Sequence, residues 1–185
     1  MIACLGWGSL IWDPRGLPVQ ESWFNDGPFL PLEFARQSSD GRLTLVLVPE
    51  LKTTVRSLWT LFSVANPGDA REALRRREGV PQNKGETHIA VWSGEQPNEG
   101  LPPNISRWAE NLGLTAVVWT ALPPKYADEE MRIPTADEAV GYLRGLPHEQ
   151  RRYAEQYIRM APRQIVTPYR RRFEAEFGWT PLSES

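Results

Sequence analysis

The chain has 185 residues, of which 41% are hydrophobic and 24% charged, which is typical of a globular domain with a substantial core rather than of a disordered chain. Its formal net charge of −2 and pI of about 5.8 argue against a protein built mainly around nucleic acid. All apolar runs are shorter than the roughly 18–20 residues that a membrane span requires.

The cellular setting is predicted from the cysteine content and the first residues. Cys4 is the only cysteine, so no disulfide can form within the chain. The N-terminal residues lack the basic flank and cleavage site of a signal peptide. We therefore expect a cytoplasmic protein with no membrane partner.

The N-terminal part of the chain has the pattern of a strand-rich body. Residues 1–5 are apolar and predict a buried strand, and prolines and glycines then predict a loop over residues 13–30. An Asp40-Gly41 pair is a favourable hairpin turn. Strands are expected on both sides of this turn and once more after it, at Leu32–Gln37, Leu43–Val48 and Val55–Val64.

A helical period follows these strands. Ala70, Ala73, Leu74 and Arg77 recur at i, i+3, i+4 and i+7, and Gly79 stands where a C-cap glycine belongs. Beyond this helix the pattern predicts a strand at His88–Trp92, a helix around Ile105–Leu112 and a strand at Thr115–Leu122.

Three helices are expected in the C-terminal third. Thr135 and Glu138 have capping-box spacing, which predicts a helix through Leu143. A second helix is expected after Pro147, and its apolar face consists of Tyr153, Ala154, Tyr157, Ile158 and Ala161. A third helix is expected over Tyr169–Phe177. We therefore expect one domain over residues 1–185, with 147–185 as a helical C-terminal extension.

The segment Gly6-Trp7-Gly8-Ser9 directly follows the first predicted strand. Glycines let a ligand approach the backbone, and successive amides in such a turn can form an anion-binding nest. The alternative is a strand-to-loop turn without a ligand. The segment lacks the third glycine of a dinucleotide site, and Ser9 is not in a Gly-x-Ser-x-Gly elbow.

Metal and triad chemistry have little support in the sequence. His88 and His148 are the only histidines, and neither has a partner at metal-ligand spacing. We interpret both as surface or packing residues, and expect neither a metal nor a cofactor.

Glu78 is the carboxylate that stands out. It lies at the edge of the apolar stripe in the last turn of the predicted helix, where burial and the helix dipole are expected to raise its pKa. Arg75, Arg76 and Arg77 would oppose that shift if they turned toward it. Two interpretations remain open, an exposed glutamate paired with one of these arginines and a proton acceptor held in a pocket.

Two segments resemble one family. "GWGSLIW" resembles the Tyr-Gly-Ser motif that opens γ-glutamylcyclotransferase-like proteins, above all their ChaC-like branch, and "LRRREGV" resembles the segment around the catalytic glutamate of that family. The order of the motifs also agrees over residues 1–125, and loosely over 126–160. Trp7 stands where tyrosine is usual, and no tyrosine follows Glu78.

The resemblance implies an α+β fold, a small mixed β-barrel with surrounding helices, of the type also named AIG2-like. It implies cofactor-free cyclisation of a small γ-glutamyl amide or peptide to 5-oxoproline, with release of an amine or amino acid. Glu78 would be the general acid/base. The substrate-binding loop would consist of Trp7, Gly8, Ser9 and Leu10.

Two other functions were weighed against this one. A catalytically inactive relative that binds a small acidic ligand would keep the same residues. Binding of nucleic acid through the C-terminal arginines is disfavoured, because glutamates are interleaved with them. The sequence does not indicate an oligomeric state.

Overall fold

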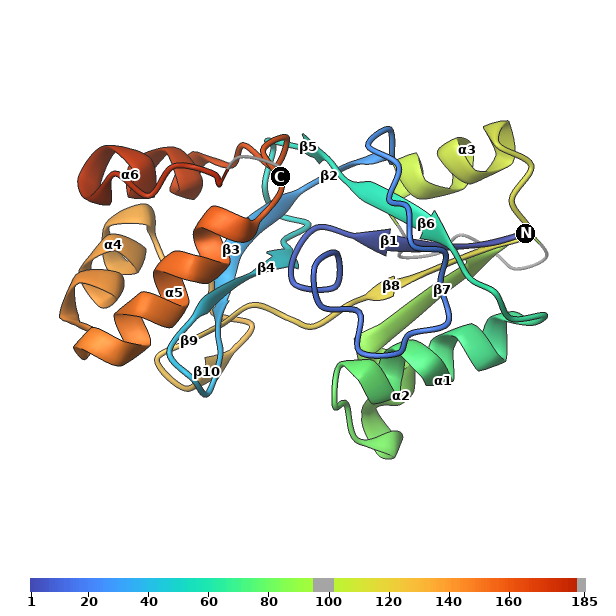
Figure 1. The fold of residues 1–185 in the computed structure, drawn as a ribbon, viewed down its shortest axis with the longest axis horizontal. Helices are drawn as coiled ribbons and strands as arrows, with labels where there is room; N and C mark the ends of the chain where they lie inside the picture. The colour runs from blue at the N-terminus through green and yellow to red at the C-terminus, as the bar shows by residue number, and fades with distance from the viewer. Residues whose placement is uncertain (95–101, 183–185) are drawn as a thin grey trace. The chain divides into compact units, whose positions relative to one another are not determined.

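The computed structural model describes residues 1–94 and 102–182 and shows an α+β protein (Figure 1). The described residues contain six α-helices and a short 3-10 helix at Gln82–Lys84. The helices are α1 Pro67–Arg77, α2 Gly85–His88, α3 Pro103–Asn111, α4 Ala136–Gly145, α5 His148–Met160 and α6 Pro168–Phe177. The strands are β1 Ile2–Gly6, β2 Phe29–Leu30, β3 Leu32–Gln37, β4 Leu43–Leu47, β5 Val55–Arg56, β6 Leu58–Leu61, β7 Ile89–Ser93, β8 Ala116–Thr120, β9 Lys125–Tyr126 and β10 Glu129–Glu130.

The chain divides into two compact units, each assembled from separate segments. Unit 1 consists of Met1–Gly6, Asp13–Leu30 and Arg56–Leu122. Unit 2 consists of Trp7–Trp12, Pro31–Val55 and Pro123–Ser185. The expectation of a single domain over residues 1–185 stays a prediction.

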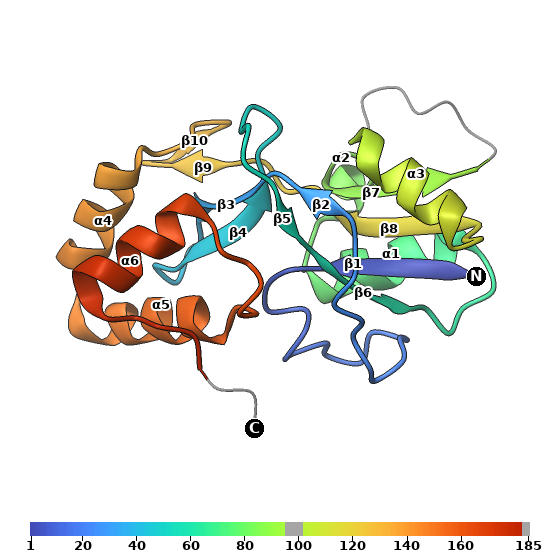
Figure 2. The same ribbon diagram turned by 90° about the horizontal axis from the view of Figure 1, so that it is seen from above.

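Unit 1 is built on a mixed four-stranded sheet with the order β6-β1-β8-β7. β1 runs antiparallel to β6 and parallel to β8, with Cys4 opposite Val118 in the parallel pair. Helices α1 and α3 lie on opposite faces of this sheet (Figures 1 and 2), which explains why β1 and most of β8 are buried as continuous apolar runs.

Unit 2 has its own mixed four-stranded sheet, with the order β10-β9-β3-β4. The hairpin of β3 and β4 turns at Asp40-Gly41, where Gly41 has φ +87° and so needs a glycine. Helix α5 packs against β4, α6 packs against β3, and α4 contacts both α5 and α6. The core between them contains Phe34, Ile158 and Phe173, none of which is exposed.

Local signals set the helix ends as predicted. Thr135 and Glu138 form a complete capping box at the start of α4. Gly79, with φ +66°, ends α1 in a Schellman turn, in which Gly79 N–H donates to the Arg76 carbonyl and Val80 N–H to the Arg75 carbonyl. The strand and helix predictions were confirmed at their positions, except that the predicted strand Val55–Val64 is two short strands, β5 and β6.

Three features differ from the sequence-based expectations. Short elements at α2, β9 and β10 were not predicted, and residues 13–30, expected as a loop throughout, end in the short strand β2. Tyr153, assigned to the apolar face of α5, is 58% exposed. Both four-stranded sheets are open, and no closed barrel is found among the described residues.

No helix within residues 1–94 and 102–182 combines the length and the apolar character that a bilayer crossing demands.

Candidate functional site

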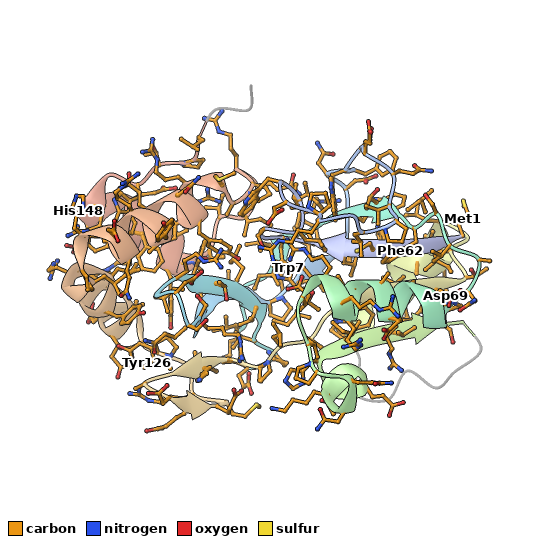
Figure 3. All side chains as sticks on the ribbon, turned by 60° about the horizontal axis from the view of Figure 1, so that its bottom comes forward. Met1, Trp7, Phe62, Asp69, Tyr126 and His148 are labelled. Atoms are coloured by element: carbon orange, nitrogen blue, oxygen red, sulfur yellow. The ribbon has the colours of Figure 1, made fainter. Side chains whose placement is uncertain are left out.

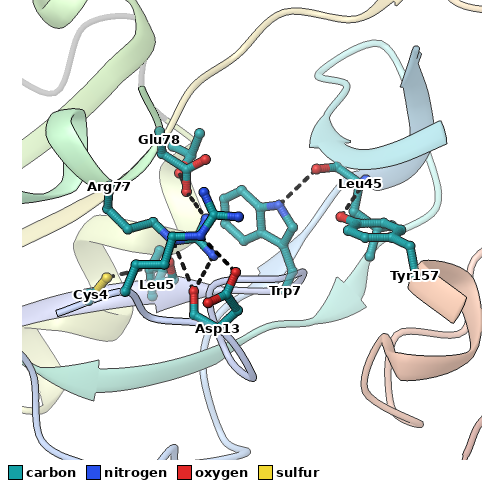
Figure 4. A network of polar contacts seen from close by, with 10 residues as sticks. Cys4, Leu5, Trp7, Asp13, Leu45, Arg77, Glu78 and Tyr157 are labelled. Atoms are coloured by element: carbon teal, nitrogen blue, oxygen red, sulfur yellow. Dashed lines mark hydrogen bonds and ion pairs between the residues drawn. The ribbon is translucent and has the colours of Figure 1, made fainter. Parts of the chain in front are cut away.

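The loop Trp7–Trp12 follows β1 and is held by its own side chains. Its backbone turns at Gly8, whose carbonyl accepts from Ile11 N–H at 3.0 Å. Trp7 is 6% exposed and donates its indole N–H to the Leu45 carbonyl at 3.2 Å (Figure 4). Ser9 is half-buried and Leu10 is buried. Trp7 therefore fixes the loop to β4 within unit 2, because its one polar group is bonded to Leu45.

Gly8 has a packing role within unit 2. A Cβ atom on Gly8 would lie 2.5 Å from the hydroxyl of Tyr157, closer than any side chain tolerates. That hydroxyl accepts a hydrogen bond from the Leu45 N–H at 3.2 Å (Figure 4). Leu45 lies on β4, an edge strand, and its N–H and carbonyl are therefore both bonded to side chains, those of Tyr157 and Trp7. Close approach of Tyr157 is thus one reason for a glycine here, and it needs no ligand.

Glu78 is positioned by the end of α1 in unit 1. It is the C-cap residue, and the Schellman turn at Gly79 fixes its backbone. Its side chain is 17% exposed and accepts from Arg77 Nη1 at 2.7 Å. The Thr120 hydroxyl, from the last residue of β8, lies 3.5 Å from Glu78 Oε1. The carboxylate is paired with an arginine, as in the first interpretation, but it is largely withdrawn from water rather than exposed. Its role as a proton acceptor stays a prediction.

Arg77 connects this carboxylate to the chain after the loop. Its side chain is only 4% exposed, and its Nε and Nη2 both donate to the carbonyl of Asp13 (Figure 4). The other two arginines of the last turn, Arg75 and Arg76, pair with Glu72 instead. Of these three arginines, only Arg77 is therefore paired with Glu78. The sequence did not indicate which of the three would turn toward this carboxylate.

Cys4 lies within the electrostatic reach of this pair. It is fully buried on β1, and burial, followed by the negative charge of Glu78, raises the pKa of its thiol above the ordinary range, while Arg77 opposes that shift. The thiol therefore stays protonated and acts as a small apolar side chain rather than a nucleophile.

A cavity of about 610 Å³ opens beside Glu78 within unit 1. One wall is the segment Arg15–Pro18 and the other is the C-terminal end of α1. The volume is in the range of small-molecule sites. Glu78, Arg76, Arg77 and Gly79 line it, so the predicted acid/base residue lies at the wall of this cavity.

The predicted site residues fall in both units. Glu78 belongs to unit 1, whereas Trp7, Gly8, Ser9 and Leu10 belong to unit 2. The pairing of this carboxylate with the loop amides therefore stays a prediction.

A second buried carboxylate, Glu33 on β3 in unit 2, was not singled out from the sequence. Glu33 is fully buried and accepts from the Thr167 hydroxyl at 2.6 Å, Phe34 N–H at 2.9 Å and Tyr169 N–H at 3.3 Å. Burial raises its pKa to about 7, although these three hydrogen bonds act in the opposite direction. The only sign of Glu33 in the sequence was its place between Leu32 and Phe34. Because side chains alternate along a strand, Glu33 lies on the face of β3 opposite to that of Leu32 and Phe34.

Several arginines of the basic C-terminal region are buried or ion-paired, while Arg152, Arg163 and Arg171 are exposed. Arg170 is fully buried and donates to the carbonyls of Ile158, Ala161, Pro162 and Ile165, which ties α6 to the end of α5. Other arginines of the region form ion pairs with acidic neighbours, as in Arg159–Glu155, Arg172–Asp137 and Arg144–Glu176.

Neither histidine belongs to a cluster of metal-ligating side chains among the described residues. His148 is exposed at the first residue of α5 (Figure 3), and His88 Nδ1 lies 2.8 Å from the Thr87 hydroxyl. In the part of the chain that the structure describes, no three His, Cys, Asp or Glu side chains gather as a metal site would require.

Comparisons with known proteins give no assignment. No family model, no curated protein and no solved structure matches the chain. The function is therefore argued from the site itself and from the resemblance of its two short segments.

Proposed function

We propose that the protein is a γ-glutamyl cyclotransferase-type enzyme, which cyclises a small γ-glutamyl amide or peptide to 5-oxoproline and releases an amine or amino acid. The observation that carries the proposal is the setting of Glu78. This carboxylate is fixed at the end of α1, is mostly withdrawn from water and opens on a cavity large enough for a peptide-sized ligand.

The proposed reaction needs positioning and one proton carrier. The α-amine of the substrate attacks its own γ-carbonyl carbon, the C–N bond to the leaving group breaks, and the ring amide of 5-oxoproline forms. Holding the substrate in the ring-closing shape contributes as much as about 7–11 kcal/mol in favourable cases. Glu78 takes the proton that the α-amine loses and returns it to the leaving nitrogen, and such help is worth about 10²–10⁴-fold.

Arg77 has a positioning role in this scheme. Its short contact with Glu78 and its bonds to the Asp13 carbonyl keep the carboxylate in one orientation at the cavity wall. Arg77 thus acts on the orientation of Glu78 and not on the substrate.

The loop Trp7–Leu10 is proposed to bind the γ-glutamyl half through its backbone amides, which would also stabilise the oxyanion of the transition state. This assignment depends on the resemblance of the segment Gly6–Leu10 to the first motif of the family.

The same proposal includes the finer fold and the setting. The mixed sheet β6-β1-β8-β7 would correspond to strands of the family's barrel in an opened form, and the protein would act in the cytoplasm without cofactor, nucleic acid or membrane partner. These assignments depend on the resemblance of the two segments.

One observation favours a second candidate, an inactive relative that binds a small acidic ligand. Glu78 is engaged by Arg77 at 2.7 Å, and a carboxylate locked in an ion pair can shape a binding site without carrying protons. Turnover separates the two candidates, since both bind the substrate.

The test is a 5-oxoproline assay with purified protein. Glutathione, γ-glutamyl dipeptides and γ-glutamyl amines are supplied in turn, and 5-oxoproline is quantified by mass spectrometry against a heat-inactivated sample. The proposal expects catalytic release from at least one of the three classes. Calorimetric binding of these compounds without any 5-oxoproline would support the inactive relative and contradict the enzyme.

A further inference from the structure

Two donors from different elements meet the same oxygen of Glu78. Arg77, the last residue of α1, donates from Nη1 to Glu78 Oε1 at 2.7 Å. Thr120, the last residue of β8, has its hydroxyl oxygen 3.5 Å from the same Oε1. No hydrogen bond or ion pair within residues 1–94 and 102–182 involves Oε2. The two oxygens of this carboxylate are therefore not equivalent.

The place of the Thr120 hydroxyl is fixed by the sheet of unit 1. β8 is an interior strand between β1 and β7, and Thr120 pairs with Ile89 of β7. The ladder continues past Thr120, since Ala121 N–H donates to the His88 carbonyl at 2.7 Å. The side chain of threonine is branched at Cβ and has few rotamers, and α1 packs against β8. The hydroxyl is thus held beside the C-terminal end of α1.

We infer that Thr120 is a positioning residue of the proposed reaction, which together with Arg77 fixes Oε1 of Glu78 and leaves Oε2 to carry the proton. The inference rests on the proposed function, because it assigns separate tasks to the two oxygens of the general acid/base. In this role Thr120 acts through Glu78 rather than on the substrate.

The division of tasks follows from the hydrogen bonds. A hydroxyl that donates to a carboxylate favours the ionised form, and Oε1 already has two donors. The proton that leaves the α-amine therefore goes to Oε2, which gives it to the leaving nitrogen, so that Glu78 ends the cycle ionised as it began it. Holding one oxygen also limits rotation of the carboxylate, and a catalytic group misplaced by about 1 Å can lose about 10²-fold in rate.

The titration of Glu78 is affected by charged groups from several elements. Those that the structure describes near it are Arg76 and Arg77 of α1, Asp13 and Arg15 of the loop before β2, and the buried Cys4 thiol of β1. None of them changes in the Thr120 variants. A change in the titration of Glu78 therefore reports the loss of the Thr120 hydroxyl.

The experiment follows the side-chain carboxyl carbon of Glu78 by carbon-13 NMR as the pH is varied. The signal is assigned by its absence from Glu78→Gln. Thr120→Val replaces the hydroxyl by a methyl group and keeps the branched shape, and Thr120→Ser restores a hydroxyl. Thr44→Val is the matched control, because Thr44 is a half-buried strand residue of unit 2 whose hydroxyl donates to the Arg36 carbonyl at 3.2 Å.

Thr120→Val is expected to move the midpoint of this titration up by about 0.4–1 pH unit, the shift that loss of one hydrogen bond to the ionised form produces. Thr120→Ser should return the midpoint to the wild-type value, and Thr44→Val should leave it in place. In the 5-oxoproline assay, Thr120→Val should lower kcat by about 2- to 10-fold at unchanged KM and move the acid limb of the kcat profile upward in pH. A merely structural threonine would move neither the midpoint nor the acid limb.

The outcomes separate this inference from the proposed function. A folded Thr120→Val protein with the wild-type midpoint overturns the role of Thr120, and turnover by the wild type would leave the enzyme standing. A raised midpoint in a protein that forms no 5-oxoproline supports the anchoring of Oε1 and contradicts the proposed function. Should Thr120→Val fail to fold, Thr120→Ala is titrated in its place and is judged by the same midpoint.

Discussion

Glu78 in unit 1 and Glu33 in unit 2 are both withdrawn from water, yet their surroundings differ. Glu78 has a guanidinium partner at 2.7 Å and lines a cavity. Glu33 is fully enclosed and is held only by one hydroxyl and two backbone N–H groups. The first arrangement provides an ion-paired carboxylate at a cavity wall, and the second provides a structural contact between β3 and the start of α6.

The comparison shows that burial by itself does not indicate a catalytic carboxylate. Burial has raised the pKa of Glu33 to about 7, a value that suits a general base, but no cavity among those described opens on it. Access and a positioned partner distinguish Glu78. The predictions below separate the two carboxylates by stability and by pH.

The largest stability effect is expected from Arg77→Met. This substitution leaves a mostly buried carboxylate without its cation and the Asp13 carbonyl without its donors, which should lower the free energy of unfolding by about 3 kcal/mol. Chemical denaturation measures this loss. Arg76→Met is the control, since its exposed pair with Glu72 should contribute less than about 1 kcal/mol. Equal losses in the two variants would contradict the role of Arg77.

Glu33 is expected to make stability depend on pH near neutrality. Its pKa is about 7 in the folded protein against a reference value of 4.5, so the folded state holds the proton more strongly. The contribution of protonated Glu33 to the free energy of unfolding is complete below pH 4.5 and is lost as the pH rises to 7. At 1.36 kcal/mol per pH unit, the free energy of unfolding falls by about 3 kcal/mol over this range.

Unfolding curves of the wild type and of Glu33→Gln at a series of pH values measure this contribution as a difference. The Gln variant keeps a neutral side chain of the same shape and should lack the decline between pH 4.5 and 7. Parallel pH profiles for the two proteins would show that folding does not change the pKa of Glu33, which contradicts this prediction.

Gly8→Ala is expected to cost about 1–3 kcal/mol, because the new methyl group would overlap the Tyr157 hydroxyl. Removing that hydroxyl with Tyr157→Phe should relieve part of the cost in the double variant, although the Leu45 N–H then loses its acceptor. A double-mutant cycle of melting curves gives the coupling. Additive losses would mean that Gly8 and Tyr157 do not compete for this space.

The smallest effect is expected from Gly79→Ala. Its φ of +66° is unfavourable for a residue with a Cβ, so the variant should lose about 1 kcal/mol. No atom lies within 4 Å of the added Cβ, so the cost is conformational rather than steric. Val80→Ala, which truncates a buried neighbour, controls for simple loss of packing at this turn. A melting temperature unchanged by Gly79→Ala would indicate that the turn tolerates the change.

Much of the fold could be predicted because its signals are local. The capping box at Thr135, the Asp40-Gly41 turn and the cap glycine Gly79 each fix a few backbone angles without help from distant residues. The same holds for β1, whose apolar run predicted a buried strand and which is buried throughout. The two-residue strands were missed because so short a segment carries no period.

The candidate site was less predictable, because it depends on which neighbour a side chain meets. Arg75, Arg76 and Arg77 look alike in the sequence, but the helix turns only Arg77 inward to Glu78 and Asp13. Arg170 and Arg171 are adjacent, yet the first is buried and the second exposed. Glu33 gave no local sign of its partners Thr167 and Tyr169, which lie more than a hundred residues away.

The central claim is that Glu78 carries the proton in a cyclisation reaction, and its most direct test is the rate of 5-oxoproline formation by Glu78→Gln beside the wild type. Glutamine keeps an oxygen for Arg77 to bind, so the fold should persist while kcat falls by about 10²–10⁴-fold. Glu86→Gln, at a glutamate that is 90% exposed, should keep full activity. A folded Glu78→Gln protein with wild-type kcat would contradict the account.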